Sequence, residues 1–345
     1  MSKKYHTTLI SLLIVAVICL FFLDIILGSV TIPMRHIINI LFSRTDNKGW
    51  EYIIMQLRLP RALVALFAGA GLSVAGLMMQ TLFRNPLAGP YVLGISSGAG
   101  LGVAIYTMLS GIIGTGAGFI ISKLNYLGQV TSAIFGAVVI LIIVISIVPK
   151  VKDSVSLLIV GIMFGSLATA VISVLQFFST PQLVQKFALW TMGSLGDVNW
   201  DQHMILSIIV ITGFAVAIFL IKPMNALLLG ESNAVTTGIE IKKTRYLIII
   251  SSSLIAGGLT AFTGPVAFIG IAIPHIVRML FNSSNHKITI PMSAICGAAL
   301  LLICDIISQV PGRSIVLPIN VLTALFGAPV VIWIIIGKKN LRTSF

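Results

Sequence analysis

One serine lies in a pattern that is typical of a covalent nucleophile. Residues 94–98 read GISSG, which matches G-x-S-x-G with Ser96 in the nucleophile position. That chemistry requires a strand, a strained turn and a helix around the serine, together with a histidine and a carboxylate. The available partners, His275 and Asp305, are far away in the chain, and apolar helical sequence surrounds all three residues. We therefore expect no hydrolase activity from Ser96.

Two carboxylates, Asp24 and Asp305, fall inside apolar segments, where ionisable residues are candidates for function. A proton or ion relay normally needs several such groups, and the alternative for Asp24 is a place near the outer end of the first helix. His275 follows Pro274 in a short apolar segment, which favours a structural role over metal binding.

No metal or nucleotide chemistry is indicated elsewhere. The three cysteines have neither the spacing of a zinc site nor that of a disulfide framework, and we expect them to be packing residues: Cys19, Cys296 and Cys304. The P-loop pattern G-x-x-x-x-G-K-[ST] does not occur in the sequence. We predict no metal site, no cofactor bound by this chain and no enzymatic activity of its own.

The composition indicates the solvent in which these residues are placed. Of 345 residues, 57% are hydrophobic and 9% are charged, whereas a soluble domain carries about a quarter charged residues. Apolar segments of roughly 20 residues, the length that crosses a bilayer as a helix, recur along the whole chain. The sequence therefore predicts an all-α polytopic membrane protein, residues 1–345 forming a single domain, with about ten spans near 9–29, 60–82, 92–111, 129–148, 155–177, 204–221, 245–262, 267–281, 289–308 and 319–337.

The net charge of +13 could suggest nucleic acid as a partner. In a polytopic protein a basic excess more often reflects lysine and arginine retained in cytoplasmic loops, and we expect no nucleic acid partner. With an even number of spans, most basic residues fall on one side when both termini are cytoplasmic. We therefore predict a multi-pass protein of a prokaryotic inner or plasma membrane, with the N-terminal apolar run retained as the first helix.

A weak internal repeat is visible. Residues 75–76 lead to GPYVLGI at 89–95, and residues 256–257 lead to GPVAFIGI at 264–271. The predicted topology inverts the two units relative to each other, and inverted repeats with short helices broken by glycine and proline are typical of transport folds.

The first of these breaks, QTLFRNPLAGP at 80–90, interrupts two apolar runs. Proline disfavours helix in the residue before it, and glycine tolerates a positive φ angle. We predict a tight re-entry turn built by Asn85, Pro86, Gly89 and Pro90, followed by a short helix whose small residues allow close packing. The alternative is a plain turn before an ordinary packing helix.

Four sequence blocks resemble one family of transporters. They are RLPRALVALFAGAGLSVAGLMMQTLFRNPLAGPYVLGISSGAG at 58–100, NALLLGESNAVTTGI at 225–239, LTAFTGPVAFIGIAIPHIVRML at 259–280, and LPINVLTALFGAPVVIWIII at 317–336. Together they resemble the FecCD-type permeases, the ABC importer subunits for iron-siderophores, haem and cobalamin. The resemblance implies a ten-helix subunit, a second permease copy that is identical or paralogous, a cytoplasmic ATPase dimer that holds ATP and Mg, and an extracytoplasmic substrate-binding protein.

In that family, the loop between the sixth and seventh spans carries a short helix that fits a cleft on the ATPase. The matching positions here are Gly230, Glu231, Asn233, Ala234, Thr237 and Gly238. Residues 233–238 can supply the helix and its glycine stop, with Glu231 near the positive N-terminal end. A solvated loop without a partner is the alternative.

Arg58 and Arg61 resemble the family's docking arginines, which pair with carboxylates of the binding protein. The alternative is anchoring to lipid phosphates. The usual third arginine is replaced by Gln309, and Val316 and Asn320 also depart from the family pattern. We consider Arg313 as a substitute, and the three departures leave the docking pattern open.

Gly161, Gly165, Thr169 and Ser173 recur every four residues in the fifth span and form one small, partly polar stripe. The resemblance implies a pathway along this span at the interface of two permease copies, whereas small-residue stripes in general are more often packing faces. The family's cytoplasmic gate region corresponds to the loop that contains Pro149 and Lys150.

Taken together, the sequence predicts the transmembrane subunit of an ATP-driven importer for an iron-siderophore or a related haem or cobalamin substrate. The rival hypothesis is an ion-coupled secondary transporter that acts without an ATPase. That rival requires charged residues at the membrane midplane, and the sequence offers few. Which chelate, haem or corrinoid is carried, and whether the two permeases are identical, is left open at this stage.

Overall fold

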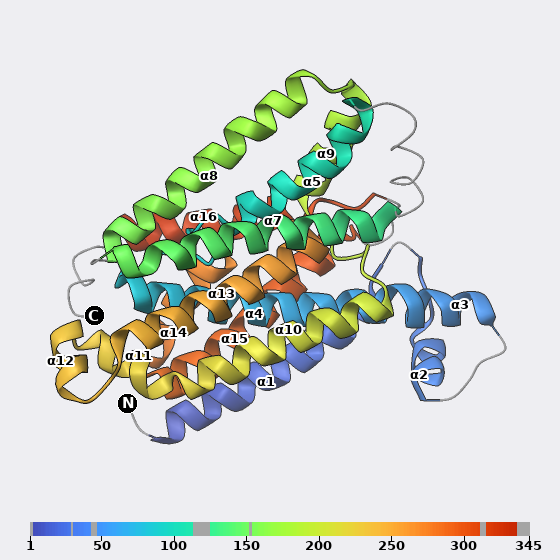
Figure 1. Ribbon diagram of the computed structural model, residues 1–345. Helices are drawn as coiled ribbons and strands as arrows, with labels where there is room; N and C mark the ends of the chain where they lie inside the picture. Colours follow the sequence, from blue (N-terminus) through green and yellow to red (C-terminus); the bar gives the residue numbers. More distant parts are fainter. Residues whose placement is uncertain are drawn as a thin grey trace.

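The computed structural model describes residues 3–28, 30–42, 47–112, 125–151, 154–310 and 315–336. Every regular element in these ranges is helical (Figure 1), which confirms the predicted all-α class. Three features lie at one end of the bundle (Figure 1): the start of α1 (Lys3–Ile26), the short helix α12 (Glu231–Thr236) and the end of α16 (Ile319–Ile336). We refer to this end of the bundle below as the α12 end.

A helix lies close to each of the ten predicted spans. Seven helical segments in the described part are long and apolar enough to cross a membrane, and they correspond to α1 (Lys3–Ile26), α4 (Leu59–Phe83), α7 (Asn125–Ile147), α8 (Ser154–Phe177), α10 (Trp200–Phe219), α13 (Ile241–Thr263) and α15 (His286–Ser308). Three shorter apolar helices match the remaining predictions: α5 (Ile95–Ile112), α14 (Ile269–Phe281) and α16 (Ile319–Ile336). Seven spans are thus supported by length, and ten crossings stay a prediction.

Short helices occupy the connections between these long ones, and of these the sequence had indicated only α12. They are α2 (Met34–Phe42), α3 (Lys48–Tyr52), a π-helical turn (Ile53–Arg58), a 3-10 turn (Val148–Lys150), α9 (Pro181–Met192), α11 (Ile221–Leu228) and α12. Polar residues interrupt most of these segments, so they lack the long apolar run on which the prediction of spans depends.

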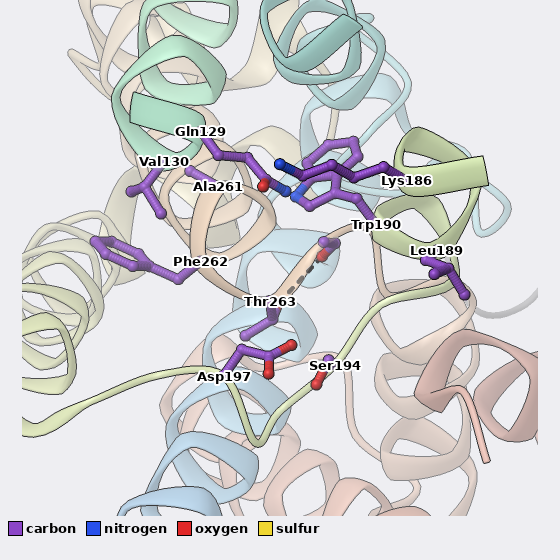
Figure 2. Close-up of a pocket in the computed structure, with 11 residues that line it drawn as sticks. Gln129, Val130, Lys186, Leu189, Trp190, Ser194, Asp197, Ala261, Phe262 and Thr263 are labelled. Carbon is purple, nitrogen blue, oxygen red and sulfur yellow. Dashed lines mark hydrogen bonds between the residues drawn. The ribbon is translucent and has the colours of Figure 1, made fainter. Parts of the chain in front are cut away.

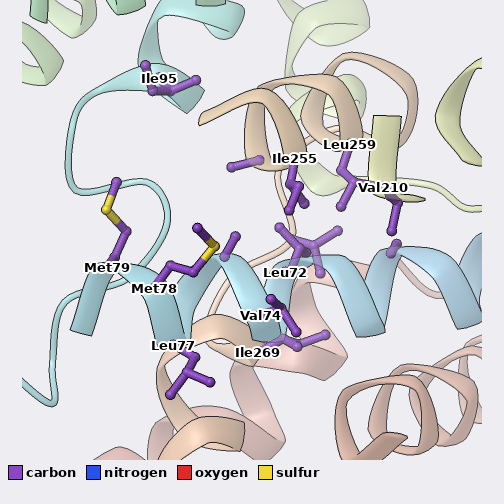
Figure 3. Packing of buried hydrophobic residues seen from close by; sticks show 14 of the residues in the cluster. Leu72, Val74, Leu77, Met78, Met79, Ile95, Val210, Ile255, Leu259 and Ile269 are labelled. Carbon is purple, nitrogen blue, oxygen red and sulfur yellow. The ribbon is translucent and has the colours of Figure 1, made fainter. Parts of the chain in front are cut away.

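α4 is the central helix of the bundle. Every residue from 68 to 83 is buried, because α10, α13, α14 and α15 all pack against this helix. Figure 3 shows Leu72 facing Ile255 and Leu259 of α13 and Val210 of α10. The apolar character of α4 on all sides, rather than along one stripe, is what a helix enclosed by other helices requires.

Two glycines let α4 approach its neighbours backbone to backbone. A Cβ atom on Gly76 would lie 1.9 Å from the carbonyl oxygen of Gly270 in α14, and one on Gly69 would lie 2.2 Å from that of Gly297 in α15. Neither space can hold a methyl group. Such small-residue contacts are the usual way in which membrane helices associate, since lipid supplies no hydrophobic drive between helices.

The two Gly-Pro segments of the internal repeat meet each other. The Val266 N–H donates to Tyr91 Oη at 3.4 Å, and Gly270 packs closely against Pro90. The contacts are also reciprocal, because Gly76 of the first unit touches Gly270 of the second, while Gly257 of the second touches Ile95 of the first. Reciprocal contacts are expected when two similar units are related by a pseudo-twofold axis.

We predict that Gly76→Ala destabilises the chain by about 1–3 kcal/mol or more, the cost of overpacking a dense interior, because the new methyl group meets the backbone of Gly270. Gly100→Ala in α5 is the matched control, since a Cβ there has no neighbour closer than 3.8 Å. Thermal unfolding in detergent measures both variants. Equal melting temperatures for the two would contradict the close approach of α4 to α14.

Candidate functional site

α12 is a single short helix with a glycine at each end. Gly230 precedes it with φ 110° and Gly238 follows it with φ 78°, backbone angles that glycine adopts without strain. The Ile239 N–H donates to the Ala234 carbonyl at 3.0 Å and the Gly238 N–H donates to that of Val235 at 2.9 Å, so the last turn is closed. The predicted helix with its glycine stop is confirmed, whereas docking to an ATPase stays a prediction.

One ion pair joins α12 to α13, and two local hydrogen bonds stabilise its ends. Glu231 Oε1 accepts from Arg245 Nη2 of α13 at 2.5 Å, and Asn233 Nδ2 donates to the Leu229 carbonyl at 2.7 Å. Thr237 Oγ1 donates to the carbonyl of Ala234, whose own side chain is buried. On the other side, Leu229 and Val235 are 69% and 59% exposed. α12 is therefore a surface element, joined to α13 by one ion pair, that presents both apolar and polar groups outward.

The α4–α5 connection lies beside this element. Arg84 Nη2 donates to the Leu228 carbonyl at 3.3 Å, and the Leu87 N–H donates to Asn85 Oδ1 at 2.9 Å, which closes the predicted turn. The positive φ angles belong to Arg84 (46°) and Gly94 (77°). The expectation that Gly89 supplies the left-handed residue was therefore wrong, since Gly89 serves instead to pack against Ile271.

The stripe on α8 divides into two parts. Gly161 and Gly165 pack against the segment before α5, where a Cβ on Gly161 would lie 2.5 Å from the Val92 carbonyl. Thr169 and Ser173 are exposed, and their hydroxyls donate to carbonyls one turn earlier. An open groove of about 440 Å³ runs along this junction and is lined by Tyr91, Val92, Gly94, Ser97, Gly161, Ile162, Gly165, Ser166 and Thr169. Gly161 and Gly165 thus form a packing face, whereas Thr169 and Ser173 are exposed, and a pathway along them stays a prediction.

The predicted gate residues Pro149 and Lys150 lie in the 3-10 turn that ends α7, exposed at the α12 end of the bundle (Figure 1). Val148 beside them is buried. The turn is thus anchored at one residue while the next two face outward, and its role in gating stays a prediction.

At the opposite end, buried charges join three helices. Arg61 of α4 binds both carboxylate oxygens of Asp305 of α15, at 2.7 to 3.0 Å, and donates to Ser308 Oγ at 2.7 Å. Gln309 Nε2 donates to Asp305 Oδ2 at 3.2 Å and to Asp24 Oδ1 of α1 at 2.9 Å. Both carboxylates are almost completely buried. The two intramembrane aspartates therefore belong to one cluster, which the sequence did not indicate.

The second predicted docking arginine is also occupied within the chain. Arg58 Nη1 donates to the carbonyls of Ile25 and Ile26 at 3.0 and 2.9 Å, and Nη2 donates to that of Val30. Arg58 is 6% exposed. Neither guanidinium is free at the surface in this structure, contrary to the expectation from sequence, and Arg313 lies outside the described residues.

The three departures from the family pattern have different surroundings. Gln309 connects the two aspartates, as described above. Asn320 Oδ1 accepts from the Ala267 N–H at 3.1 Å and so holds the segment before α14. Val316 is 54% exposed. Gln309 and Asn320 therefore have structural roles, while Val316 has no internal contact that explains it.

A second cavity opens between α7, α9 and the end of α13. Its volume is about 200 Å³, and Lys186, Gln129 and Trp190 lie on one side with Asp197 and Ser194 on the other (Figure 2). Sites for drug-sized ligands usually measure about 300–1,000 Å³. This cavity is therefore smaller than such a site, whereas the groove along α8, at about 440 Å³, falls within that range.

Residues 13–337 match the FecCD transport family, which is almost the whole chain. The chain belongs to this family. The hemin transport system permease protein HmuU of Yersinia pestis is 30% identical over 320 residues, 92% of each chain. The vitamin B12 import system permease protein BtuC of Citrobacter koseri is 34% identical over 292 residues, 84% of each chain. A solved structure described as an inward-facing metal-chelate type ABC transporter matches with a TM-score of 0.82 and 26% identity, covering 96% of this chain and 99% of its own.

In the described part of this FecCD chain, the carboxylate considered as a partner for the nucleophile pattern is engaged elsewhere. Ser96 lies in the first turn of α5, and Asp305 is bound by Arg61 and Gln309 instead of a histidine. The requirements for a serine hydrolase are therefore not met around Ser96. Of the cysteines, Cys296 and Cys304 are buried as expected, whereas Cys19 is exposed on α1, so its prediction as a packing residue was wrong.

We predict that Arg61→Met alone destabilises the FecCD chain by roughly 3–5 kcal/mol, because it leaves the buried Asp305 without its cation. The double variant Arg61→Met with Asp305→Leu removes both charges, and Gln309 keeps Asp24 as an acceptor. We expect that variant to recover much of the loss in thermal unfolding experiments. If the single and double variants melt at the same temperature, the ion pair is not what holds the α4–α15 contact.

Proposed function

We propose that this chain is the transmembrane permease subunit of an ATP-driven importer for an iron-siderophore or a related haem or cobalamin substrate. The observation that carries the proposal is α12, a glycine-bounded helix that is fixed to α13 through Glu231 and exposed on its outer side. The functions named for the FecCD relatives, hemin and vitamin B12 transport, support the substrate class.

In this proposal the chain is one permease domain with ten crossings of the inner membrane of a prokaryote, both termini in the cytoplasm. The α1 N-terminal end and α12 lie at the same end of the bundle (Figure 1), which supports this orientation, as does the distribution of basic residues. α12 then faces a cytoplasmic ATPase dimer, which holds ATP and Mg, and the cluster around Asp305 lies near the extracytoplasmic surface.

The proposed mechanism is alternating access between two permease copies, identical or paralogous. Closure of the ATPases displaces α12, and the groove along α8 becomes part of the pathway at the interface of the two copies. The exposed hydroxyls of Thr169 and Ser173 bond to their own backbone, so they present a smooth wall that does not hold a passing chelate. The gate is the turn at Pro149 and Lys150.

Substrate arrives on an extracytoplasmic binding protein that docks at the opposite end. Arg61 is the docking candidate that the structure favours, because its side chain keeps 15% exposure next to Asp305. Arg58 supports docking indirectly by fixing the end of α1, and Arg313 stays a candidate on sequence grounds. Charged rim contacts of this kind chiefly affect the association rate and its dependence on salt.

Capture of the partner ATPase tests the coupling role. Glu231→Arg places a second cation against Arg245 and should abolish co-purification of an ATPase from the native membrane. The exchange of both residues, Glu231→Arg with Arg245→Glu, restores the ion pair, and we expect it to restore capture at least in part. This result would assign Glu231 to holding α12 in place rather than to a direct contact with the ATPase.

The same experiment can overturn the importer proposal. A wild-type chain that is purified gently, carries no ATPase and still moves solute in liposomes without ATP would be a secondary transporter. Against this alternative, Asp305 is paired with Arg61 and is not free as a carrier site, whereas Asp24 is bound only at Oδ1, by Gln309.

The pathway assignment makes a separate prediction. Thr169→Trp fills the groove along α8 and should slow uptake, whereas Leu167→Trp, an exposed position on the opposite side of the same helix, should not. Uptake of ferric hydroxamate, hemin and cyanocobalamin by cells that carry each variant measures the effect, with membrane levels of the protein as a control. Equal inhibition by both variants would contradict a pathway along the stripe.

A further inference from the structure

A buried polar chain connects three helices at the α12 end. Thr81 of α4 and His286 of α15 are 1% exposed, and Thr81 Oγ1 lies 2.8 Å from His286 Nε2. On the other side of the ring, His286 Nδ1 lies 2.7 Å from Oδ1 of Asn225 in α11. One imidazole thus bridges α4 and α11, which are 144 residues apart at Thr81 and Asn225.

The proton position on His286 Nδ1 follows from the acceptor that it faces, Asn225 Oδ1. Asn225 Oδ1 accepts from the backbone N–H of His286 at 2.9 Å, and Asn225 Nδ2 donates to Asn285 Oδ1 at 3.1 Å. The amide orientation is therefore determined by its neighbours, and an amide oxygen can only accept. His286 Nδ1 must carry a hydrogen. The one hydroxyl hydrogen of Thr81 has two acceptors within reach, His286 Nε2 at 2.8 Å and the Leu77 carbonyl at 2.9 Å.

Both ends of this network of polar side chains lie next to elements of the proposed transport mechanism. Asn225 is in the last turn of α11, and two residues, Leu229 and Gly230, separate α11 from α12. Thr81 lies in the last turn of α4, which is followed by the segment 84–94. The far end of that segment, Gly94, packs against Gly161 and Gly165 of α8 beside the groove.

We propose that His286 is a positioning residue that makes α11 and α12 move together with the end of α4, so that displacement of α12 reaches the groove through residues 84–94. This inference rests on the coupling role proposed above for α12. The exposed contact between Arg84 and the Leu228 carbonyl, at 3.3 Å, is too long and too accessible to water to carry this connection alone.

The two halves of the bridge can be broken separately. His286→Asn keeps an amide near the position of Nδ1 and can still reach Asn225, whereas His286→Gln keeps one near Nε2 and can still reach Thr81. Thr81→Val removes only the hydroxyl. The matched control is Ser252→Ala in α13, since the hydroxyl of Ser252 is equally buried and donates only to carbonyls of its own helix.

The first measurement needs no partner protein. Spin labels at Val235→Cys on α12 and Leu87→Cys in the α4–α5 connection, with the three native cysteines replaced, report the distance between the two elements in the purified chain in nanodiscs. We expect one narrow distance distribution in the parent chain and in Ser252→Ala, and a broadened one in Thr81→Val and His286→Gln. Unchanged distributions in both bridge variants would overturn the proposal.

The second measurement uses the chain assembled with its ATPase and binding protein in liposomes. For whichever of ferric hydroxamate, hemin or cyanocobalamin the parent assembly transports, we expect the amount moved per ATP to fall several-fold in the bridge variants, while ATP hydrolysis continues. A broadened distance with an unchanged ratio would overturn transmission through His286. If the distance distribution broadens in the bridge variants but the parent chain binds no ATPase, the proposal of a mechanical bridge stands and the importer role is overturned.

Discussion

The backbone of α4 touches the backbones of α14 and α15, and this contact determines how the rest of the bundle is placed. It depends on the absence of side chains at Gly69, Gly76, Gly270 and Gly297. Because water is not available to satisfy polar groups within a membrane, helices there gain stability from dense packing. Once α4 is enclosed, α13 and α10 cover its other side, and both Gly-Pro segments are directed toward the same region.

Polar groups are concentrated at the two ends of this apolar core. At one end, Arg58 and Arg61 use their donors within the chain and hold α1 and α15 against α4. At the other, Glu231 with Arg245 fixes α12, and His286 joins Thr81 of α4 to Asn225 of α11. Buried polar groups are costly unless they are paired, so each cluster also restricts the relative positions of the helices it joins.

The surface elements are therefore attached in different ways. α12 is held by one ion pair and by the helix before it, and it exposes Leu229 and Val235. α8 packs on the segment before α5 through glycine contacts and leaves Thr169 and Ser173 in the open. α12 is thus joined to the bundle chiefly by polar contacts, whereas α8 is joined to it by close backbone packing at glycines.

The sequence by itself determined the elements that local physics controls. Apolar length placed the long helices, Asn85 and Pro86 indicated the turn after α4, and Gly238 indicated the end of α12, because each signal is contained within a few neighbouring residues. Only the tertiary structure decided which polar groups meet. Arg61 and Asp305 are 244 residues apart, and Thr81 and His286 are 205 apart, so no spacing in the sequence predicts either pair. The helix α9 was missed because its polar residues hide its helical period. The positive φ angles expected at glycine in the turn after α4 occur at Arg84 and Gly94. Gly89 packs against Ile271 instead, a contact that the sequence does not show.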